Sequence, residues 1–334
     1  MNCCLFLVLA ALAVPLASAE TFHLPTANDA LFKPGEDEKY FVGTTGKPWV
    51  SGTFGCVRSD GRQLHEGLDV RCIARDKQGE PKDSVLATAD GAVAYLNKRP
   101  SLSNYGNYVV LRHHIDGLEI YSLYAHLREI RGDLKIGSTV KSGEAIAIMG
   151  RTSNTHERIS RERAHVHFEL DFFVSERFSA WHKKAFPGQR NDHGDWNGQN
   201  MIGVDPQTAL LADRKHGEKF NLLGWIQRQP ELCRVVVRDT HFPWLKRYAP
   251  LIRLNSVAQK EGIAAYELVL NFNGLPFQVI PRAASEMKGL GKYRLLSVNE
   301  AEYKKNPCRK LVTNRNGRWE LGSNGIRLLD LLTF

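Results

Sequence analysis

Two short stretches of the chain carry side chains that could hold a metal ion. One reads HEGLDV and contains His65 and Asp69, and the other reads RAHVHFELDF and contains His165 and His167. Either motif alone arises easily by chance in a chain of 334 residues with 12 histidines. Together, His65, Asp69 and one histidine of the pair offer two nitrogens and one carboxylate oxygen. Three protein ligands with an open fourth position are typical of a catalytic zinc site, whereas a structural zinc site is closed by four.

A third histidine has a position that suits catalysis. Side chains two apart on a strand point to the same face, so His165 and His167 are expected to face one cleft. A rigid strand does not easily bring both rings to one ion, and we expect one ring to bind while the other acts beside it. His126, in YAHL, ends the second strand of a predicted hairpin, where an active-site residue would be well placed.

The elements that must position these histidines are short strands. In NYVVLRHHIDGLEIYSLYAHL, two β-prone segments meet at Asp116-Gly117, which is a favoured hairpin turn. VLATADGAVAYL and GEAIAIMG are further short segments bounded by glycines. Closely spaced short strands without intervening helical periods predict a mainly β fold, an antiparallel β-sandwich or open barrel, over about residues 50–213.

The chain changes character after this region. The apolar residues of EKFNLLGWIQRQ recur at helical spacing, and Asn273-Gly274 and Asn316-Gly317 each stand between two strand-like segments. We therefore expect a smaller, mostly β C-terminal domain with one helix over residues 214–334. It contains no constellation of residues that indicates a site.

The first residues predict export. Residues 1–19 have an apolar core followed by Ala17-Ser18-Ala19, which is typical of a cleavable secretory signal peptide. The core is too short to span a bilayer comfortably, so we expect no transmembrane span in the mature chain; an uncleaved anchor is the alternative. Residues 20–49 then form an N-terminal strap or linker.

Loss of the leader leaves four cysteines, and an even number in an exported protein indicates disulfide bonds. Pairing within each expected domain would join Cys56 to Cys72 and Cys233 to Cys308. A zinc site built from cysteines is the alternative, but the chain has no Cys-x-x-Cys spacing.

The formal charge of +9 favours an anionic partner, such as a bacterial wall, although basicity also serves solubility alone. Nucleic-acid binding is disfavoured because the chain has no basic-aromatic motif and carries a secretory leader.

The order of HEGLD, YGN, YAHL and HVHFE resembles the lysostaphin/LytM-type zinc metallopeptidases, which cut peptidoglycan peptides and have a duplicated-hybrid-motif-like β fold. SGTFG, ATADGAV, VKSGEAIAIMG and VDPQTAL match this family too, so the resemblance covers about residues 50 to 211. It implies one Zn²⁺ ion bound by His65, Asp69 and His167. It also implies that His126 and His165 are the two catalytic histidines.

The resemblance implies an exported zinc metalloendopeptidase that hydrolyses peptide bonds in bacterial peptidoglycan cross-links or stem peptides. After cleavage of the signal peptide it would be secreted or periplasmic. The alternative is a non-catalytic peptidoglycan-binding or hydrolase-activator module on the same fold. The presence of all three metal ligands and of the two catalytic histidines favours the enzyme. A further alternative is a latent form in which His23 or Asn28 of the strap blocks the metal.

One loop departs from the family pattern. The segment GRTSNTHERISRERAH is longer and more charged than the compact turn usual there. Its arginines are Arg151, Arg158, Arg161 and Arg163. One hypothesis is that some of them pair with substrate carboxylates. The alternative is a solvated loop with a local ion pair such as Glu157–Arg161.

Overall fold

The structure is a computed structural model that describes residues 21–155, 159–289 and 291–334. The expected leader, residues 1–19, and Arg158 lie outside these ranges. Within them, no helix combines the length and the apolarity that a membrane span requires.

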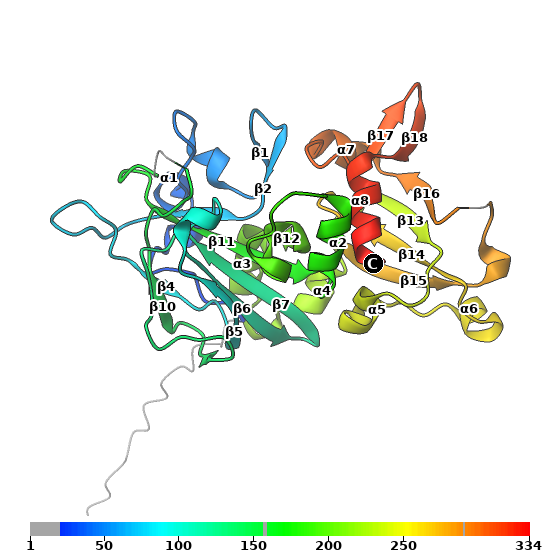
Figure 1. Ribbon diagram of the computed structural model, residues 1–334, viewed down its shortest axis with the longest axis horizontal. Coiled ribbons are helices and arrows are strands. Elements are labelled where there is room, and N and C mark those ends of the chain that lie inside the picture. The colour runs from blue at the N-terminus through cyan, green and yellow to red at the C-terminus, as the bar shows by residue number, and fades with distance from the viewer. Residues whose placement is uncertain (1–20, 156–158, 290) are drawn as a thin grey trace, which may run out of the picture.

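An antiparallel sheet of seven strands forms the centre of the N-terminal half of the molecule (Figure 1). Strands β12, β11, β7, β6, β5 and β9 lie side by side in this order, and β3 is the seventh. Strand β3 pairs with the first half of β11 and β12 with its second half, on the edge opposite β7. The strands are β3 (Leu68–Arg71), β5 (Gly91–Asn97), β6 (Tyr108–Ile115), β7 (Leu118–Ala125), β9 (Thr139–Val140), β11 (His165–Phe173) and β12 (Met201–Val204). The prediction of a mainly β, antiparallel fold is confirmed.

The hairpin between β6 and β7 is also confirmed. Asp116 has φ of 50° and Gly117 has φ of 77°, as a two-residue type I′ turn requires. The turn sets the register in which Val109 faces Tyr124, and it thereby fixes the end of β7, after which His126 follows.

Two smaller sheets flank the central one. Their strands are β1 (Gly55–Arg58) with β2 (Gln63–His65), and β4 (Ser84–Leu86) with β10 (Ala145–Ile148) and β8 (Glu129–Ile130). The helices of this half are α1 (Asp37–Tyr40), α2 (Phe178–Ala185) and α3 (Pro206–His216).

The N-terminal strap lies along β3. The amide of Val42 donates to the carbonyl of Asp69, and Phe41 forms a bridge with Val70. The Asn28 side-chain amide donates to backbone carbonyls, and the His23 ring bonds to the carbonyl of Leu24. The structure therefore does not place either of these two side chains at the candidate metal ligands, as the latent form would require.

The C-terminal region has a second antiparallel sheet in the order β15-β14-β13-β16 and a separate hairpin. The strands are β13 (Cys233–Val237), β14 (Ala265–Leu270), β15 (Pro276–Arg282), β16 (Tyr293–Val298), β17 (Val312–Arg315) and β18 (Arg318–Leu321). Its helices are α4 (Leu222–Ile226), α5 (Pro243–Arg247), α6 (Ser256–Glu261), α7 (Glu300–Lys305) and α8 (Ser323–Leu332). Short 3-10 helices occur at Ala30–Phe32, Trp49–Gly52, Pro100–Leu102, Gly194–Trp196, Gly198–Asn200, Gly217–Lys219, Ala249–Leu251 and Ala284–Glu286.

The expectation of one helix in this region is wrong. Four of the five α-helices there span only five or six residues, too few to show a clear apolar period in the sequence. Local capping helps to define three of them: the side chains of Asn221, Asn255 and Asn299 each accept a hydrogen bond from a first-turn amide.

The two halves share a core. The Phe172 ring of β11 lies 5.0 Å from the Tyr248 ring and 6.1 Å from the Trp244 ring, measured between centroids. The Tyr248 hydroxyl also accepts a hydrogen bond from the amide of Phe173 at 2.9 Å. Trp244 and Tyr248 are completely buried, so these contacts fasten the C-terminal region to the central sheet.

The expected disulfide pairing is wrong. Cys56 of β1 bonds to Cys308, and Cys72 and Cys233 are buried free thiols. The pairing within domains failed because the β1–β2 hairpin packs beside the C-terminal region, at 252 residues' separation along the chain. The disulfide therefore joins the two halves rather than closing a loop within either one.

Candidate metal centre

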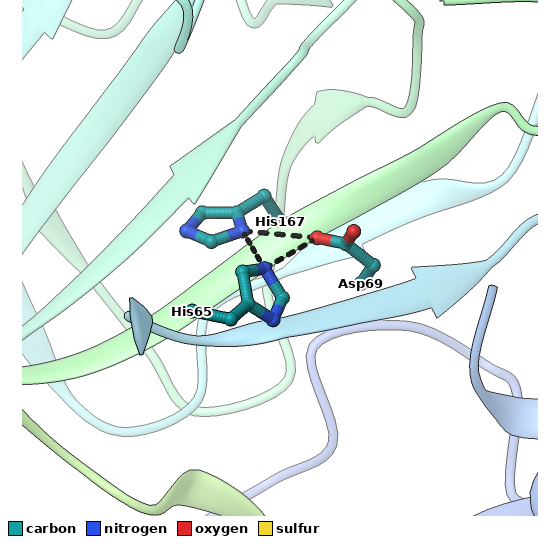
Figure 2. A group of neighbouring side chains, drawn as sticks. All are labelled: His65, Asp69 and His167. Atoms are coloured by element: carbon teal, nitrogen blue, oxygen red, sulfur yellow. Dashed lines mark hydrogen bonds and ion pairs between the residues drawn. The ribbon is translucent and has the colours of Figure 1, made fainter. Parts of the chain in front are cut away.

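Three strands, β2, β3 and β11, bring His65, Asp69 and His167 together (Figure 2). His65 ends β2, and Asp69 on β3 stands directly opposite His167 on β11. His65 Nε2 lies 3.1 Å from Asp69 Oδ1 and 3.1 Å from His167 Nδ1, and His167 Nδ1 lies 3.0 Å from Asp69 Oδ1. These edges are close to the ~3.3 Å edge of a tetrahedron with metal bonds of ~2.0–2.1 Å.

The outer hydrogen bonds of the two rings decide which nitrogens face inward. His65 Nδ1 lies 2.7 Å from the carbonyl oxygen of Thr53, so it carries the proton and Nε2 keeps its lone pair. His167 Nε2 lies 2.7 Å from Glu169 Oε1, and with its proton there Nδ1 is left as a lone pair. With both imidazoles neutral, two lone pairs and a carboxylate oxygen thus converge without a hydrogen between them. This donor set fits a bound cation.

The charges around the centre also favour a cation. Burial opposes ionisation of Asp69, but the surrounding His165, His65 and His167 overcome it and hold the pKa of its carboxyl well below the usual range. Arg58 donates to the outer oxygen, Asp69 Oδ2, at 2.5 Å. Burial likewise disfavours a charged His167, but Asp69 and Glu169 raise its pKa to about 10. The two carboxylates therefore stabilise a positive charge at this position, whether it is a second proton on the His167 ring or a cation at Nδ1.

His126 and His165 lie beside the three candidate ligands. Their ring centroids are 4.8 Å apart, and the His126 ring is 6.0 Å from that of His167. His126 Nδ1 bonds to the carbonyl of Thr152 at 2.9 Å, and His165 Nδ1 to the carbonyl of Arg163 at 2.6 Å. Both rings therefore keep an Nε2 lone pair. Burial lowers the pKa of both imidazoles, which keeps them neutral and able to accept a proton.

The backbone at His126 is unusual. Its φ of 61° lies in the left-handed region, which residues other than glycine rarely adopt and which accumulates at functional sites. The strand ends here, and the amide of His126 donates to the carbonyl of Tyr105 instead of continuing the ladder. Gly150 packs against this turn so closely that a Cβ would lie 2.6 Å from the His126 oxygen. The conformation aims the ring toward His165.

All five histidine and aspartate side chains line one cleft of about 850 Å³. Thr44, Thr45 and Lys47 of the strap also line it, and Tyr105 contributes an aromatic side chain. The strap thus contributes to a wall of the cleft.

The arginines of the long loop make different contacts. Arg151 and Arg161 both pair with Glu80, at 2.8 Å, and these two guanidinium groups lower the pKa of the Glu80 carboxyl to about 2. Arg163 lines the cleft and donates to the carbonyl of Gly43 and the hydroxyl of Thr45. For Arg151 and Arg161 the structure favours the alternative of an ion-paired loop, although the partner is Glu80. Glu157, the partner expected for Arg161, lies outside the described residues.

Glu169 and Tyr105 were not among the site residues expected from the sequence. Glu169 is buried and takes hydrogen bonds from His167 and from the Tyr105 hydroxyl, each at 2.7 Å. Strand alternation could have indicated Glu169, because it lies two residues after His167 on the same face. Nothing in the local sequence of Arg58 indicated its contact with Asp69.

Part of the chain is similar to known proteins. Residues 63–177 match Peptidase family M23. Lipoprotein NlpD of Yersinia enterocolitica is 31% identical over 97 residues, which are 29% of this chain and 86% of that protein. Murein hydrolase activator NlpD of Escherichia coli is 33% identical over 129 residues, 39% of this chain and 27% of that protein. An uncharacterized metalloprotease of Haemophilus influenzae is 35% identical over 106 residues, 32% of this chain and 18% of that protein.

Solved structures with a similar region include the catalytic domain of lysostaphin from Staphylococcus simulans. It is 19% identical, with 48% of this chain and 87% of that one covered and a TM-score of 0.29. A zinc containing peptidase from Vibrio cholerae is 26% identical, with 40% and 30% covered and a TM-score of 0.24. The chain belongs to Peptidase family M23. It spans only about a quarter of the length of the E. coli relative.

Proposed function

We propose that the protein is an exported zinc metalloendopeptidase that hydrolyses peptide bonds in bacterial peptidoglycan. The observation that carries this proposal is the meeting of His65, Asp69 and His167 with two neutral histidines in one open cleft. The names of relatives support it, since they include a metalloprotease and a zinc containing peptidase.

In this proposal His65, Asp69 and His167 hold the metal. A zinc ion bound there supplies an acidified water and a Lewis acid for the scissile carbonyl. Glu169 and the carbonyl of Thr53 orient the two rings by taking their outer protons. Arg58 holds the Asp69 carboxylate so that one oxygen stays directed inward.

His126 and His165 move the protons. Their lowered pKa values leave the Nε2 atoms unprotonated near neutral pH, ready to take a proton from the attacking water. The same imidazoles then deliver a proton to the leaving amine, and an imidazolium so formed stabilises the developing oxyanion. Both rings are held by backbone carbonyls, which limits their reorientation during the reaction.

The expected leader and the names of the relatives support a location in the cell envelope or outside the cell. We propose that residues 1–19 direct export and are removed, which leaves the mature chain in the periplasm or outside the cell. Residues 50–213 form the peptidase domain, and residues 214–334 a second domain. The name of the Yersinia relative, a lipoprotein, is consistent with a protein of the cell envelope.

The test is to incubate the mature protein with defined muropeptides, with and without a chelator, and to identify the products by mass. We expect cleavage of one type of peptide bond, its loss with the chelator and its return with added zinc. Cleavage that persists after complete metal removal would refute the proposed chemistry.

A second function is favoured by the names of the E. coli relative and its counterparts, which are murein hydrolase activators. In that case the chain would bind peptidoglycan and stimulate another hydrolase without cutting. Tightly bound zinc, no cleavage of purified sacculi, and stimulation of a separate amidase or peptidase would establish this alternative.

A further inference from the structure

One face of the C-terminal sheet is rich in arginine. The opposite face packs in the core, where Val235 and Val237 are completely buried and Tyr293 bonds to Asp330 of α8. Strand alternation directs the residues between these to the other face. Val236 of β13 stands opposite Glu267 of β14 and opposite Arg294 of β16, so these three residues lie on this second face. The arginines of this face are Arg234 and Arg238 from β13 and its end, Arg282 from β15 and Arg294 from β16.

Two of these arginines are neutralised by carboxylates. Glu267 is only 2% exposed and accepts from Arg234 at 3.0 Å and from Arg282 at 2.6 Å. Glu231 pairs with Arg234 and Glu286 with Arg282. The three acids of the face are therefore engaged by the same two guanidinium groups, which this network holds in fixed positions.

The other two arginines have no ion-pair partner among the described residues. Arg238 and Arg294 are exposed, and each donates to a backbone carbonyl, that of Gly289 and that of Lys288 respectively. A guanidinium has five N–H donors, so one such bond orients the group and leaves most donors available. A cavity of about 240 Å³ lies between them, lined also by Val236 and Leu296.

We propose that this cavity is a binding site for carboxylate groups of the polymer on which the cleft acts, and that it holds the protein on that polymer. The inference rests on the proposed function. The planar fork of arginine suits a carboxylate. The cavity is lined by three arginines and Lys288 but by only two acids, Glu267 and Glu286. Its lining contains no aromatic ring on which a nucleic-acid base would stack. The cavity shares no residue with the metal cleft, and β16 lies well apart from β11 (Figure 1).

The test measures binding separately from cleavage. The full mature chain is sedimented on ice, in short incubations, with purified sacculi and with the same sacculi after carbodiimide amidation of their carboxyl groups. The variant is Arg238→Gln/Arg294→Gln. The control is Lys135→Gln/Lys215→Gln, which removes the same charge from exposed lysines outside this face.

We expect the arginine variant to bind untreated sacculi about tenfold more weakly than the wild type, since two charged contacts are lost. The lysine control should bind like the wild type, and amidation should weaken wild-type binding by a similar factor. The amidated sacculi test the site without any mutation, so they do not depend on the folding of a variant.

Equal weakening in the lysine control would overturn the inference, because it would mean binding by net charge alone. Undiminished binding to amidated sacculi would overturn it as well. So would a variant that loses affinity for duplex DNA but not for sacculi. Hydrolysis of a small soluble muropeptide should be unchanged in the arginine variant. Failure of all cleavage would count against the proposed function alone, and unchanged binding of Arg238→Gln/Arg294→Gln against this inference alone.

Discussion

Glu169 offers a sharp test of how the proposed metal centre is built, because it touches only one of the three candidate ligands. The side chain is 1% exposed, and its Oε1 accepts from His167 Nε2 and from the Tyr105 hydroxyl, both at 2.7 Å. Glu169→Gln preserves the shape and an acceptor oxygen but removes the charge. Glu169→Ala removes the acceptor altogether.

The magnitude follows from the bond that is changed. A hydrogen bond to a charged group contributes about 1.5–3 kcal/mol and a neutral one about 0.5–1.5 kcal/mol. The difference of about 1–1.5 kcal/mol predicts a zinc affinity about tenfold lower for Glu169→Gln. Glu169→Ala should lower the affinity by up to about 100-fold, the upper range for such outer partners of a metal-bound histidine.

The assay is competition for zinc with a chromophoric chelator. Tyr105→Phe is the matched control, because it removes the other bond to the same oxygen and leaves that of His167 intact. Zinc affinity should be nearly unchanged in this control. A Glu169→Ala variant that binds zinc as tightly as the wild type would refute the assignment of His167 Nδ1 as a ligand atom.

Two further predictions concern stability. Cys56→Ser/Cys308→Ser should lower the free energy of unfolding by about 2–5 kcal/mol, measured by urea denaturation against the oxidised wild type, because the bond joins positions 252 residues apart. An unfolding midpoint equal to that of the oxidised wild type would contradict the role of this bond. Burial lowers the pKa of His113 to about 4, below an unfolded value near 6.5, so the unfolded chain binds the extra proton between these pH values. Stability should therefore be complete above pH 6.5 and fall by up to about 3 kcal/mol as the pH drops from 6.5 to 4. His113→Gln should flatten this dependence and the exposed His114→Gln should not; equal acid sensitivity in both variants would show that another group is responsible.

The sequence predicted the parts of the site that depend on local rules. Alternation along β11 places His165 and His167 on one face, and the Asp116-Gly117 turn fixes the strand end beside His126. The mainly β fold follows from the same short, turn-bounded segments. These features are set by residues within a few positions of one another.

The rest depends on contacts between distant segments. Cys308 reaches Cys56 only because the C-terminal region packs beside the β1–β2 hairpin, and no spacing rule reports that packing. Arg58 and Tyr105 reach Asp69 and Glu169 across different strands and loops. The short helices of the C-terminal region were missed because five or six residues carry too little period to be distinguished from turns.

The most direct test of the metal centre is the zinc content of two purified variants measured by mass spectrometry beside their activity. Asp69→Ala should lose most of its zinc and its activity together, since Asp69 Oδ1 completes the triangle of donor atoms. His126→Ala should keep nearly one zinc per chain while turnover on muropeptides falls steeply. Full zinc in Asp69→Ala, or loss of zinc in His126→Ala, would contradict the account.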